Sequence, residues 1–295
     1  MIKKIAEYLD ELKSELAGRD TALIQDALTD AEEHLRNALE EEIAKIPGAN
    51  EEEALLTLID KYGAPQEIAA AYLEIESRFL PALAAKKRQV PRPFWAKFFG
   101  VAADAGTWGS FLYILLSLPT AILFSMWALM GGIVSFFSLA LIIGIPLTGL
   151  FLLSLRGIAL LEGRIVEALL GVRMPRKPIF LRKGLNWRQK YKALATESYT
   201  WKVFAYLILH LPLGLIYLLF VPILLALSIK CALYPAWYWG FGRPLITIGQ
   251  PIYPEAWTYP LVVAAGILLF FSTLHLARFI GSIHGRFAKY MLVRK

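Results

Sequence analysis

Two histidines lie in stretches of the chain that otherwise carry almost no ionisable groups. His210 lies inside an uncharged run from Val203 to Ile229, and His275 lies near the end of a second run from Pro260 to Ala277. An ionisable group in an apolar segment is costly to bury, so it is a functional candidate, here a polar or proton-sensing spot between helices. The alternative is a neutral histidine bonded to neighbouring backbone or serine. His210 is the candidate ligand-binding residue of the pair.

An aromatic segment between residues 234 and 259 is the second candidate site. It holds eight aromatic side chains and four prolines. Tyr234, Trp237 and Trp239 could form a lid or groove for an apolar or cationic ligand, and Arg243 could hold an anionic headgroup. The alternative is an aromatic belt that anchors a re-entrant segment in the outer membrane interface.

Motifs for catalysis are missing from the sequence. It contains no phosphate-binding loop, no nucleophile elbow, no HExxH pair and no DNA-reading helix. The single cysteine, Cys231, excludes an internal disulfide framework and a cysteine-based zinc cluster. We therefore expect no catalytic residues, no metal ligands, no cofactor and no enzymatic activity.

The distribution of charge divides the chain, and with it the elements that hold the candidate residues, into an acidic and a basic part. The chain has 295 residues, of which 57% are hydrophobic and 19% charged, so it is more apolar than a soluble domain. Residues 1–80 carry a net charge of −11, and residues 81–295 carry +18. The acidic start has no apolar signal-peptide region, which predicts that it stays in the cytosol. The net charge of +7 is therefore an average that does not point to nucleic acid.

Residues 1–80 predict a small acidic helical domain in the cytoplasm. Apolar residues recur at helical spacing over 5–16 and 20–43, with stops at Gly18 and Pro47-Gly48. Asn50 predicts the cap of a third helix that closes at Gly63, and Pro65 predicts the start of a fourth. Residues 81–104 then predict a basic linker and a basic, aromatic interfacial segment.

The remainder, residues 105–295, predicts four membrane spans. No Asp, Glu, Lys or Arg occurs from Ala105 to Leu155, a run of 51 residues, whereas one span needs only about 20. We expect spans over about 108–130, 133–155, 203–229 and 260–277, with the first two joined near Met130-Gly131-Gly132.

Basic residues gather on one predicted side of the membrane. The loop 156–202 holds 11 Lys and Arg against three Glu, and the C-terminal tail is also basic. The positive-inside rule makes this side cytoplasmic, with both termini there. These bases could bind anionic lipids of the inner leaflet, or dock the acidic N-terminal domain.

An internal repeat at an offset of 93 residues relates two of the predicted spans. Thr107 to Pro119 and Thr200 to Pro212 share the pattern Thr-Trp-x-x-Phe-x-Tyr-x-x-Leu-x-Leu-Pro. Both copies begin on the same side, which predicts a parallel repeat. Trp108 and Trp201 are candidate membrane-interface anchors. Pro119 and Pro212 are hinge candidates, or else parts of a duplicated packing unit.

The duplicated spans resemble the bacterial Putative sensor membrane domain, which is often fused to histidine kinases. The resemblance rests on the repeat, on Leu169 to Pro175, on Asn186-Trp187-Arg188 and on Tyr234 to Trp239, and it covers about residues 105–242. It implies a sensory role in the inner membrane of a bacterium without known catalytic residues, and we expect no kinase region in this chain.

The N-terminal helices resemble the small HAAS-like signalling domain found beside PadR-like transcription regulators. Tyr8-Leu9 with Leu12, His34-Leu35, and the run from Tyr62 to Ala69 carry this resemblance, over about residues 1–76. It implies a PadR-like regulator or another cytoplasmic signalling protein as partner.

The sequence therefore predicts an all-α protein with a cytoplasmic helical domain and a four-span membrane bundle. Its expected function is a non-enzymatic sensor or regulatory subunit that relays a stimulus through the helical domain. A transporter or channel component is the alternative. A homo-oligomer is possible, and direct nucleic-acid binding is not expected.

Overall fold

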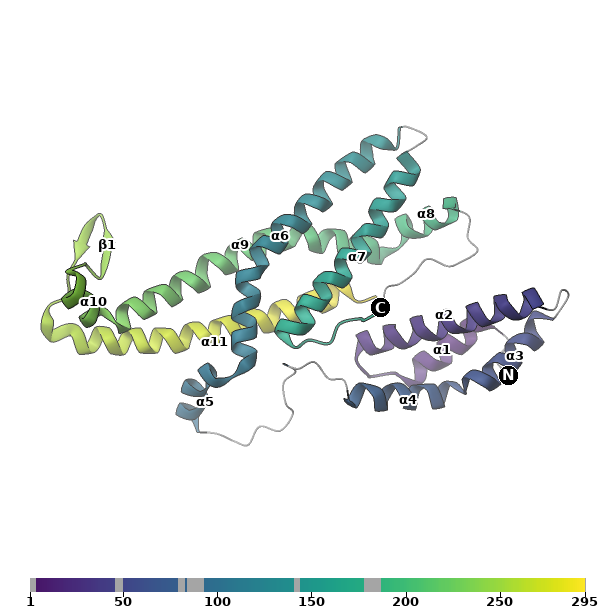
Figure 1. Ribbon diagram of the computed structural model, residues 1–295, viewed down its shortest axis with the longest axis horizontal. Helices are drawn as coiled ribbons and strands as arrows, with labels where there is room; N and C mark the ends of the chain where they lie inside the picture. The colour runs from purple at the N-terminus through teal and green to yellow at the C-terminus, as the bar shows by residue number, and fades with distance from the viewer. Residues whose placement is uncertain are drawn as a thin grey trace.

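The computed structural model describes residues 4–45, 50–78, 83, 93–140, 144–177 and 187–294. Its described residues are almost all helical, which confirms the all-α prediction. The predicted turn at Pro47-Gly48, most of the predicted linker, and Asn186 of the resemblance lie outside the described residues. Figure 1 shows the N-terminal helices as a group of their own beside the helices of the remaining chain.

The N-terminal domain consists of the four helices that the sequence predicts. They are α1 (Ile5–Glu15), α2 (Thr21–Lys45), α3 (Glu51–Tyr62) and α4 (Pro65–Arg78). The Asn50 side chain caps α3 by accepting a hydrogen bond from the Glu52 amide, because the first amides of a helix have no partner within it. Gly63 ends α3 with a φ of 111°, a conformation that favours glycine.

A small apolar core joins α1, α2 and α4, and a second apolar cluster packs α3 against α2. Tyr8 on α1 is fully buried, and its hydroxyl donates to the Gly63 carbonyl at 2.9 Å. The other buried members of the core come from α1, α2 and α4: Leu12, Leu16, Ala27, Ala31, Leu35 and Ala69. The amphipathic spacing in the sequence therefore corresponds to a real buried face.

Four helices are long and apolar enough to cross a membrane. They are α6 (Ala105–Ser138), α7 (Gly144–Leu170), α9 (Ser198–Ala232) and α11 (Tyr259–Leu292). At a rise of 1.5 Å per residue, a helix of 34 residues such as α6 is about 51 Å long, more than the roughly 30 Å hydrocarbon core.

The first hairpin turns later than the sequence suggests. Helix α6 continues through Met130-Gly131-Gly132 to Ser138. A Cβ added to Gly131 would lie 2.2 Å from the Phe151 ring of α7, so this glycine lets the two helices pack closely instead of forming a turn. Helix α7 likewise continues past Leu155 to Leu170, through residues that we assigned to a loop.

Shorter elements connect and cover the long helices. Helix α5 (Phe94–Gly100) and a 3₁₀ turn (Val101–Ala103) precede α6, and α8 (Trp187–Thr196) precedes α9. Helix α10 (Tyr234–Phe241), strands β1 (Ile246–Ile248) and β2 (Gln250–Ile252), and a second 3₁₀ turn (Ala256–Thr258) join α9 to α11. The strands pair antiparallel about Gly249, with Ile246 opposite Ile252.

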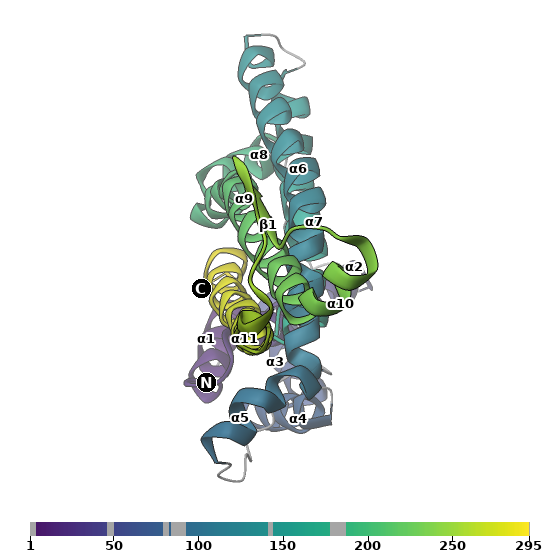
Figure 2. The ribbon, with the colours of Figure 1, turned by 90° about the vertical axis from the view of Figure 1, so that its left-hand side faces the viewer.

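The long helices form two hairpins that cross. Helices α9 and α11 pack side by side, and α6 crosses this pair, as Figures 1 and 2 show. Gly214 lies at the α6–α9 crossing, where an added Cβ would be 3.1 Å from the Ser117 carbonyl oxygen. Gly281 of α11 also lies at a contact, because a Cβ there would lie 2.4 Å from Ser110 Oγ of α6.

The helical domain packs against the ends of α7 and α11. Ala22 of α2 belongs to the main apolar core formed with α7, α9 and α11. The backbone amide of Arg294, just after α11, donates to Gln25 Oε1 of α2 at 2.7 Å. In Figure 1 the C-terminus lies beside this domain.

Candidate functional site

The two copies of the internal repeat make the same local contacts. The indole Nε1 of Trp108 donates to the Ala102 carbonyl at 2.7 Å, and that of Trp201 donates to the Ala195 carbonyl at 2.7 Å. Each tryptophan is about half exposed. The repeat is therefore present in the structure as well as in the sequence, since each indole donates a hydrogen bond to the carbonyl six residues before it. The placement of both residues at a membrane interface stays a prediction.

The tyrosines of the two copies converge on one carboxylate. Tyr113 of α6 and Tyr206 of α9 donate to Glu162 Oε1 of α7 at 2.8 and 3.0 Å. The same two hydroxyls lie 2.6 and 3.1 Å from His284 Nε2 of α11. Glu162, His284 and Tyr206 have no exposed surface, and Tyr113 has almost none. A duplicated side chain thus contributes twice to one buried polar site.

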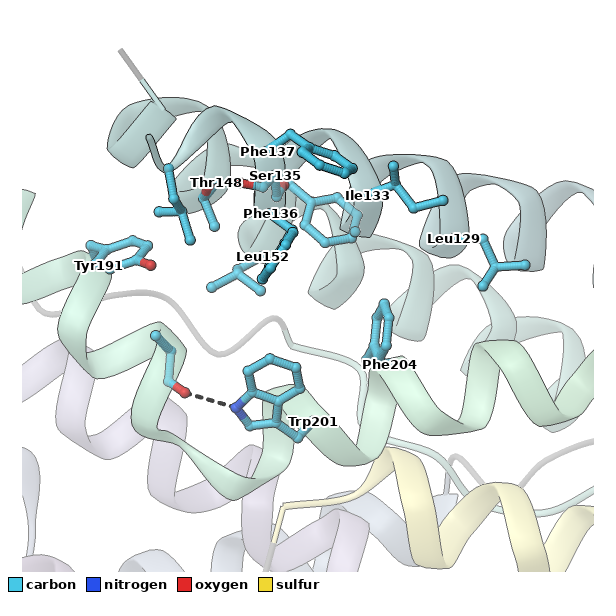
Figure 3. Close-up of a pocket in the computed structure, with 14 residues that line it drawn as sticks. Leu129, Ile133, Ser135, Phe136, Phe137, Thr148, Leu152, Tyr191, Trp201 and Phe204 are labelled. Carbon is cyan, nitrogen blue, oxygen red and sulfur yellow. Dashed lines mark hydrogen bonds between the residues drawn. The ribbon is translucent and has the colours of Figure 1, made fainter. Parts of the chain in front are cut away.

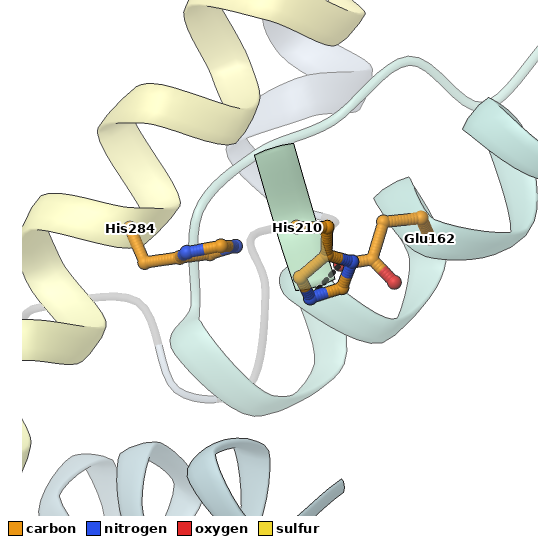
Figure 4. A group of neighbouring side chains, drawn as sticks. All are labelled: Glu162, His210 and His284. Carbon is orange, nitrogen blue, oxygen red and sulfur yellow. Dashed lines mark ion pairs between the residues drawn. The ribbon is translucent and has the colours of Figure 1, made fainter. Parts of the chain in front are cut away.

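His210 is the member of this site that the sequence singles out. It is fully buried, and its Nε2 lies 3.5 Å from Tyr113 Oη and 3.9 Å from Glu162 Oε1. It takes the place in the second repeat that Ser117 takes in the first, so the duplication is broken here by an imidazole. Figure 4 shows Glu162, His210 and His284 on three different helices.

We call Glu162, His210, His284, Tyr113 and Tyr206 the polar cluster. Donor atoms of the carboxylate and the two imidazoles all lie within 4.8 Å of one another. Among the described residues, Glu162 Oε2 and His210 Nδ1 have no hydrogen-bond partner. Because buried polar atoms are rarely left unpaired in native proteins, the polar cluster is a candidate binding site.

Sequence reasoning missed two members of the polar cluster. Glu162 was counted with the cytoplasmic loop, since it follows the uncharged run, and His284 was not considered because it follows the last predicted span. Helices α7 and α11 continue beyond those runs and carry both residues into the bundle. The signal that could have found them is the repeated tyrosine, since two buried hydroxyls need a shared acceptor.

His275 lies apart from the polar cluster. Its Nε2 is 3.1 Å from the Phe98 carbonyl oxygen, and its ring stacks on the Phe98 ring with centroids 5.4 Å apart. His275 therefore matches the alternative stated for these histidines, a side chain that is hydrogen-bonded to neighbouring backbone.

Of the four residues predicted to form the aromatic site, only Trp239 lines a cavity. Trp239 lines a cavity of about 860 Å³ between α10 and the start of α11, together with Tyr238, Tyr253, Pro254 and Tyr259 among others. Tyr234 is buried beneath it, with its ring 5.5 Å from that of Tyr259. Trp237 instead packs on Phe241, and Arg243 is exposed to solvent. Ligand binding here stays a prediction.

The two proline hinge candidates lie inside continuous helices. Helix α6 remains helical across Pro119, and α9 remains helical across Pro212 and Pro222. Bending at these prolines stays a prediction, and their place next to the crossing at Gly214 makes close packing the simpler role.

A second hollow lies between the first hairpin and the start of α9. It encloses about 490 Å³ and is lined almost wholly by apolar side chains, including Phe136, Phe151, Leu152, Trp201 and Phe204. Figure 3 shows the Trp201 indole and the Phe204 ring beside this space, and Trp201 Nε1 donates to the carbonyl of Ala195, which also lines it. Its chemistry suits lipid chains.

Arg173, just after α7, forms a buried ion cluster with the helical domain. Its guanidinium donates to Asp26 Oδ2 of α2 and to Glu76 Oε1 of α4, both at 2.8 Å. Asp26 Oδ1 also accepts the backbone amides of Arg176 and Lys177 at 2.8 and 3.1 Å. Burial alone would lower the pKa of Arg173, but the hydrogen bond with Glu76 and the charge of Asp26 raise it overall. We call these contacts the docking cluster.

The rim of the docking cluster is more exposed. Lys177 pairs with Asp30 of α2, which also accepts from the Tyr72 hydroxyl, and Lys289 of α11 pairs with Asp20 at 2.5 Å. Burial works against the charged form of Asp30, yet the bonds from Lys177 and Tyr72 lower its pKa. The bases of the membrane part thus contact the acidic domain, as the charge distribution suggested.

These features together describe a multi-pass membrane protein whose bundle carries a docked helical domain at one end. The chain matches the family described as Putative sensor over residues 113–292 and the HAAS family over residues 7–71. Since the first match covers more than half of the chain, the protein belongs to the Putative sensor family. No curated protein and no solved structure matches the chain. Both resemblances read from the sequence are confirmed, and they support a sensor or signalling role.

Proposed function

We propose that this protein is a non-enzymatic sensor of the bacterial inner membrane that relays changes in its four long helices to a cytoplasmic partner through its HAAS domain. The observation that carries the proposal is the docking cluster. Arg173 is 8% exposed and its partner Asp26 is 6% exposed, so this ion pair is largely removed from solvent. Buried pairs of this kind depend strongly on geometry, which makes the contact sensitive to small shifts of α7.

Two short paths join the bundle to the HAAS domain. Along α7, Glu162 of the polar cluster lies 11 residues before Arg173. Between them, Glu167 accepts from Arg176 at 3.0 Å, so the end of α7 is tied to the docking segment. Along α11, His284 lies five residues before Lys289, which pairs with Asp20. A rotation or shift of either helix would therefore change a docking contact directly.

The HAAS match also supports the kind of partner. HAAS domains are associated with PadR-like regulators, so a PadR-like transcription regulator is the proposed recipient of the signal. Under this proposal both termini and the docking cluster lie in the cytoplasm, where the basic segments at the ends of α7 and α11 meet the positive-inside rule.

The relay can be tested by a substitution in the bundle at a residue that makes none of the ion pairs. Gly281→Leu would force a side chain against Ser110 of α6, so we expect α11 to shift relative to α6. The full-length protein in lipid nanodiscs would be compared with wild type by hydrogen–deuterium exchange. We expect faster exchange in α2 and α4, neither of which contains the substitution.

Gly157→Leu is the matched control. Gly157 is an exposed glycine of α7, and a Cβ there meets no atom of the described structure within 4 Å. It should leave exchange in α2 and α4 unchanged. Gly281→Leu could speed hydrogen exchange in the long helices while α2 and α4 exchange as in wild type. In that case the HAAS domain does not respond to changes in the bundle, and the proposal is wrong.

A further inference from the structure

The polar cluster has the donors of a transition-metal site. We infer that Glu162, His210, His284 and Tyr113 bind one divalent transition-metal ion between the four long helices, and that this ion is an input of the sensor. The inference deepens the proposed function and rests on it only for the relay step. No sequence motif indicates the site, because its four ligands come from four separate helices.

The geometry brings four donor atoms around one centre. Tyr113 Oη lies 2.8 Å from Glu162 Oε1, 2.6 Å from His284 Nε2 and 3.5 Å from His210 Nε2. Glu162 Oε1 and His210 Nε2 are 3.9 Å apart. A tetrahedral ion with bonds of about 2.0–2.2 Å separates its ligands by roughly 3.3–3.6 Å. The observed separations lie on both sides of that range, so small side-chain movements are sufficient.

Neighbouring tyrosines hold the ligands in the required orientation. Tyr217 Oη lies 3.2 Å from His284 Nδ1, which directs the Nε2 of the same ring toward the centre. Tyr206 donates to Glu162 Oε1 at 3.0 Å and so fixes the carboxylate. Ligating histidines and carboxylates usually have such outer hydrogen bonds, and their loss typically costs 10–100-fold in metal affinity.

Charge and unpaired atoms favour a cation over a plain hydrogen-bond network. Glu162 is fully buried, and His210 is the only basic group within 4.0 Å of it in the described part of the chain. The Glu162 carboxylate and a Tyr113 phenolate together neutralise a dication, because the phenol on coordination gives up its proton to the water that the ion sheds as it enters. Glu162 Oε2 and His210 Nδ1 have no partner among the described residues, so the hydrogen bonds of the polar cluster leave one further oxygen and one further ring nitrogen of two proposed ligands available to an ion.

The donor set also selects the class of ion. Two imidazole nitrogens with carboxylate and phenolate oxygens suit zinc, iron, manganese or cobalt. Magnesium and calcium prefer sites made entirely of oxygen, so neither should compete.

The test is metal binding by the full-length chelator-treated protein in nanodiscs, with Zn²⁺, Mn²⁺ and Co²⁺ as probes. We expect about one ion per chain, and a Co²⁺ absorption spectrum typical of tetrahedral coordination. Glu162→Gln, His210→Gln and His284→Gln should each weaken binding at least tenfold, and Tyr113→Phe should weaken it and change the Co²⁺ spectrum. The amide oxygen introduced by Glu162→Gln can still accept from both tyrosines, so this variant best preserves the fold.

His275→Gln is the matched control, since His275 lies on the same helix as His284 but bonds Phe98 instead. It should bind metal as wild type does. Binding that is absent in wild type, or indifferent to Glu162→Gln and His284→Gln, would reduce the polar cluster to a structural network and overturn the site.

A second measurement separates the site from the relay. Adding Zn²⁺ to the wild-type protein should change hydrogen exchange in α2 and α4, and adding it to Glu162→Gln should not. Stoichiometric binding without any change in the HAAS domain would overturn the ion as input. That result would not bear on the relay, which Gly281→Leu tests by itself. Failure of the ion as input and failure of the relay can therefore be told apart.

Discussion

The docking cluster and the polar cluster are both buried groups of ionisable side chains, but their charges are balanced differently. In the docking cluster Arg173 lies between two carboxylates, each at 2.8 Å. In the polar cluster one carboxylate faces two imidazoles and two phenols, and two of its buried atoms have no partner among the described residues. The first arrangement is complete and holds two domains together. In the second, no lysine or arginine of the described residues pairs with the Glu162 carboxylate, which is why we assign cation binding to it.

The largest effect on hydrogen exchange is expected when the docking cluster loses its arginine. Arg173→Met would leave Asp26 and Glu76 facing each other without their cation, and removing one partner of a buried pair costs about 3–5 kcal/mol. We expect the HAAS domain to undock, which hydrogen exchange would report as faster exchange in α2 and α4. Arg286→Met is the control, because Arg286 is exposed and bonds only Ser282 of its own helix among the contacts described. Unchanged exchange in Arg173→Met would mean that docking does not depend on this arginine.

A smaller effect, on thermal stability, is expected from a substitution in the polar cluster. Glu162→Gln keeps the acceptor for Tyr113 and Tyr206 but places an amide donor where Oε2 has no partner, at a cost of about 1–3 kcal/mol. Thermal unfolding in nanodiscs should show this loss, while exchange in α2 and α4 without metal stays as in wild type. Undocking by this variant would show that the two clusters are not separate, contrary to the comparison.

Acid should weaken the rim of the docking cluster only at low pH. The pKa of Asp30 is below its ordinary value of 3.8, since Lys177 and Tyr72 outweigh the effect of burial. A carboxyl with a lowered folded-state pKa stabilises the contact above its unfolded pKa and loses that contribution as pH falls through the folded value. Crosslinking between the HAAS domain and α11 should therefore be constant from pH 7 to 5 and decline below about pH 4. A decline already at pH 6 would point to another group.

The smallest effect is expected for the exposed pair. The Lys177 and Asp30 side chains are 46% and 37% exposed, and surface ion pairs contribute about 0–1 kcal/mol. Lys177→Ala should change the exchange of α2 far less than Arg173→Met, and raising the salt concentration should reduce even that difference. An effect as large as that of Arg173→Met would contradict the ranking by burial.

Local sequence patterns predicted the helical domain and the existence of the long helices. Periodic apolar residues, Asn50, Gly63 and Pro65 correspond to the observed helix ends, because capping depends on a few neighbouring residues. Charge-free runs identified the spans but not their ends. A helix continues wherever its polar residues find partners, as Glu162 does with Tyr113 and Tyr206.

The polar cluster could be predicted only in part. His210 was identified because it interrupts an apolar run, and its repeat counterpart Ser117 shows that this position is not fixed by the duplication. Its partners lie 48 residues before it and 74 residues after it, beyond any spacing rule. The docking cluster was visible only as opposite net charges, since the choice of Arg173 among many bases depends on the turn at Gly171, whose φ is 68°.

Disulfide crosslinking across the docked surface tests the central claim most directly. In a Cys231→Ser background, cysteines would replace Gln25 of α2 and Arg294 after α11, which are in contact through the Arg294 amide. We predict rapid crosslinking within single chains in native membranes, slowed at least tenfold by Arg173→Met, a factor that needs only about 1.4 kcal/mol. Equal rates with and without Arg173 would contradict the account of how the sensor is joined to its HAAS domain.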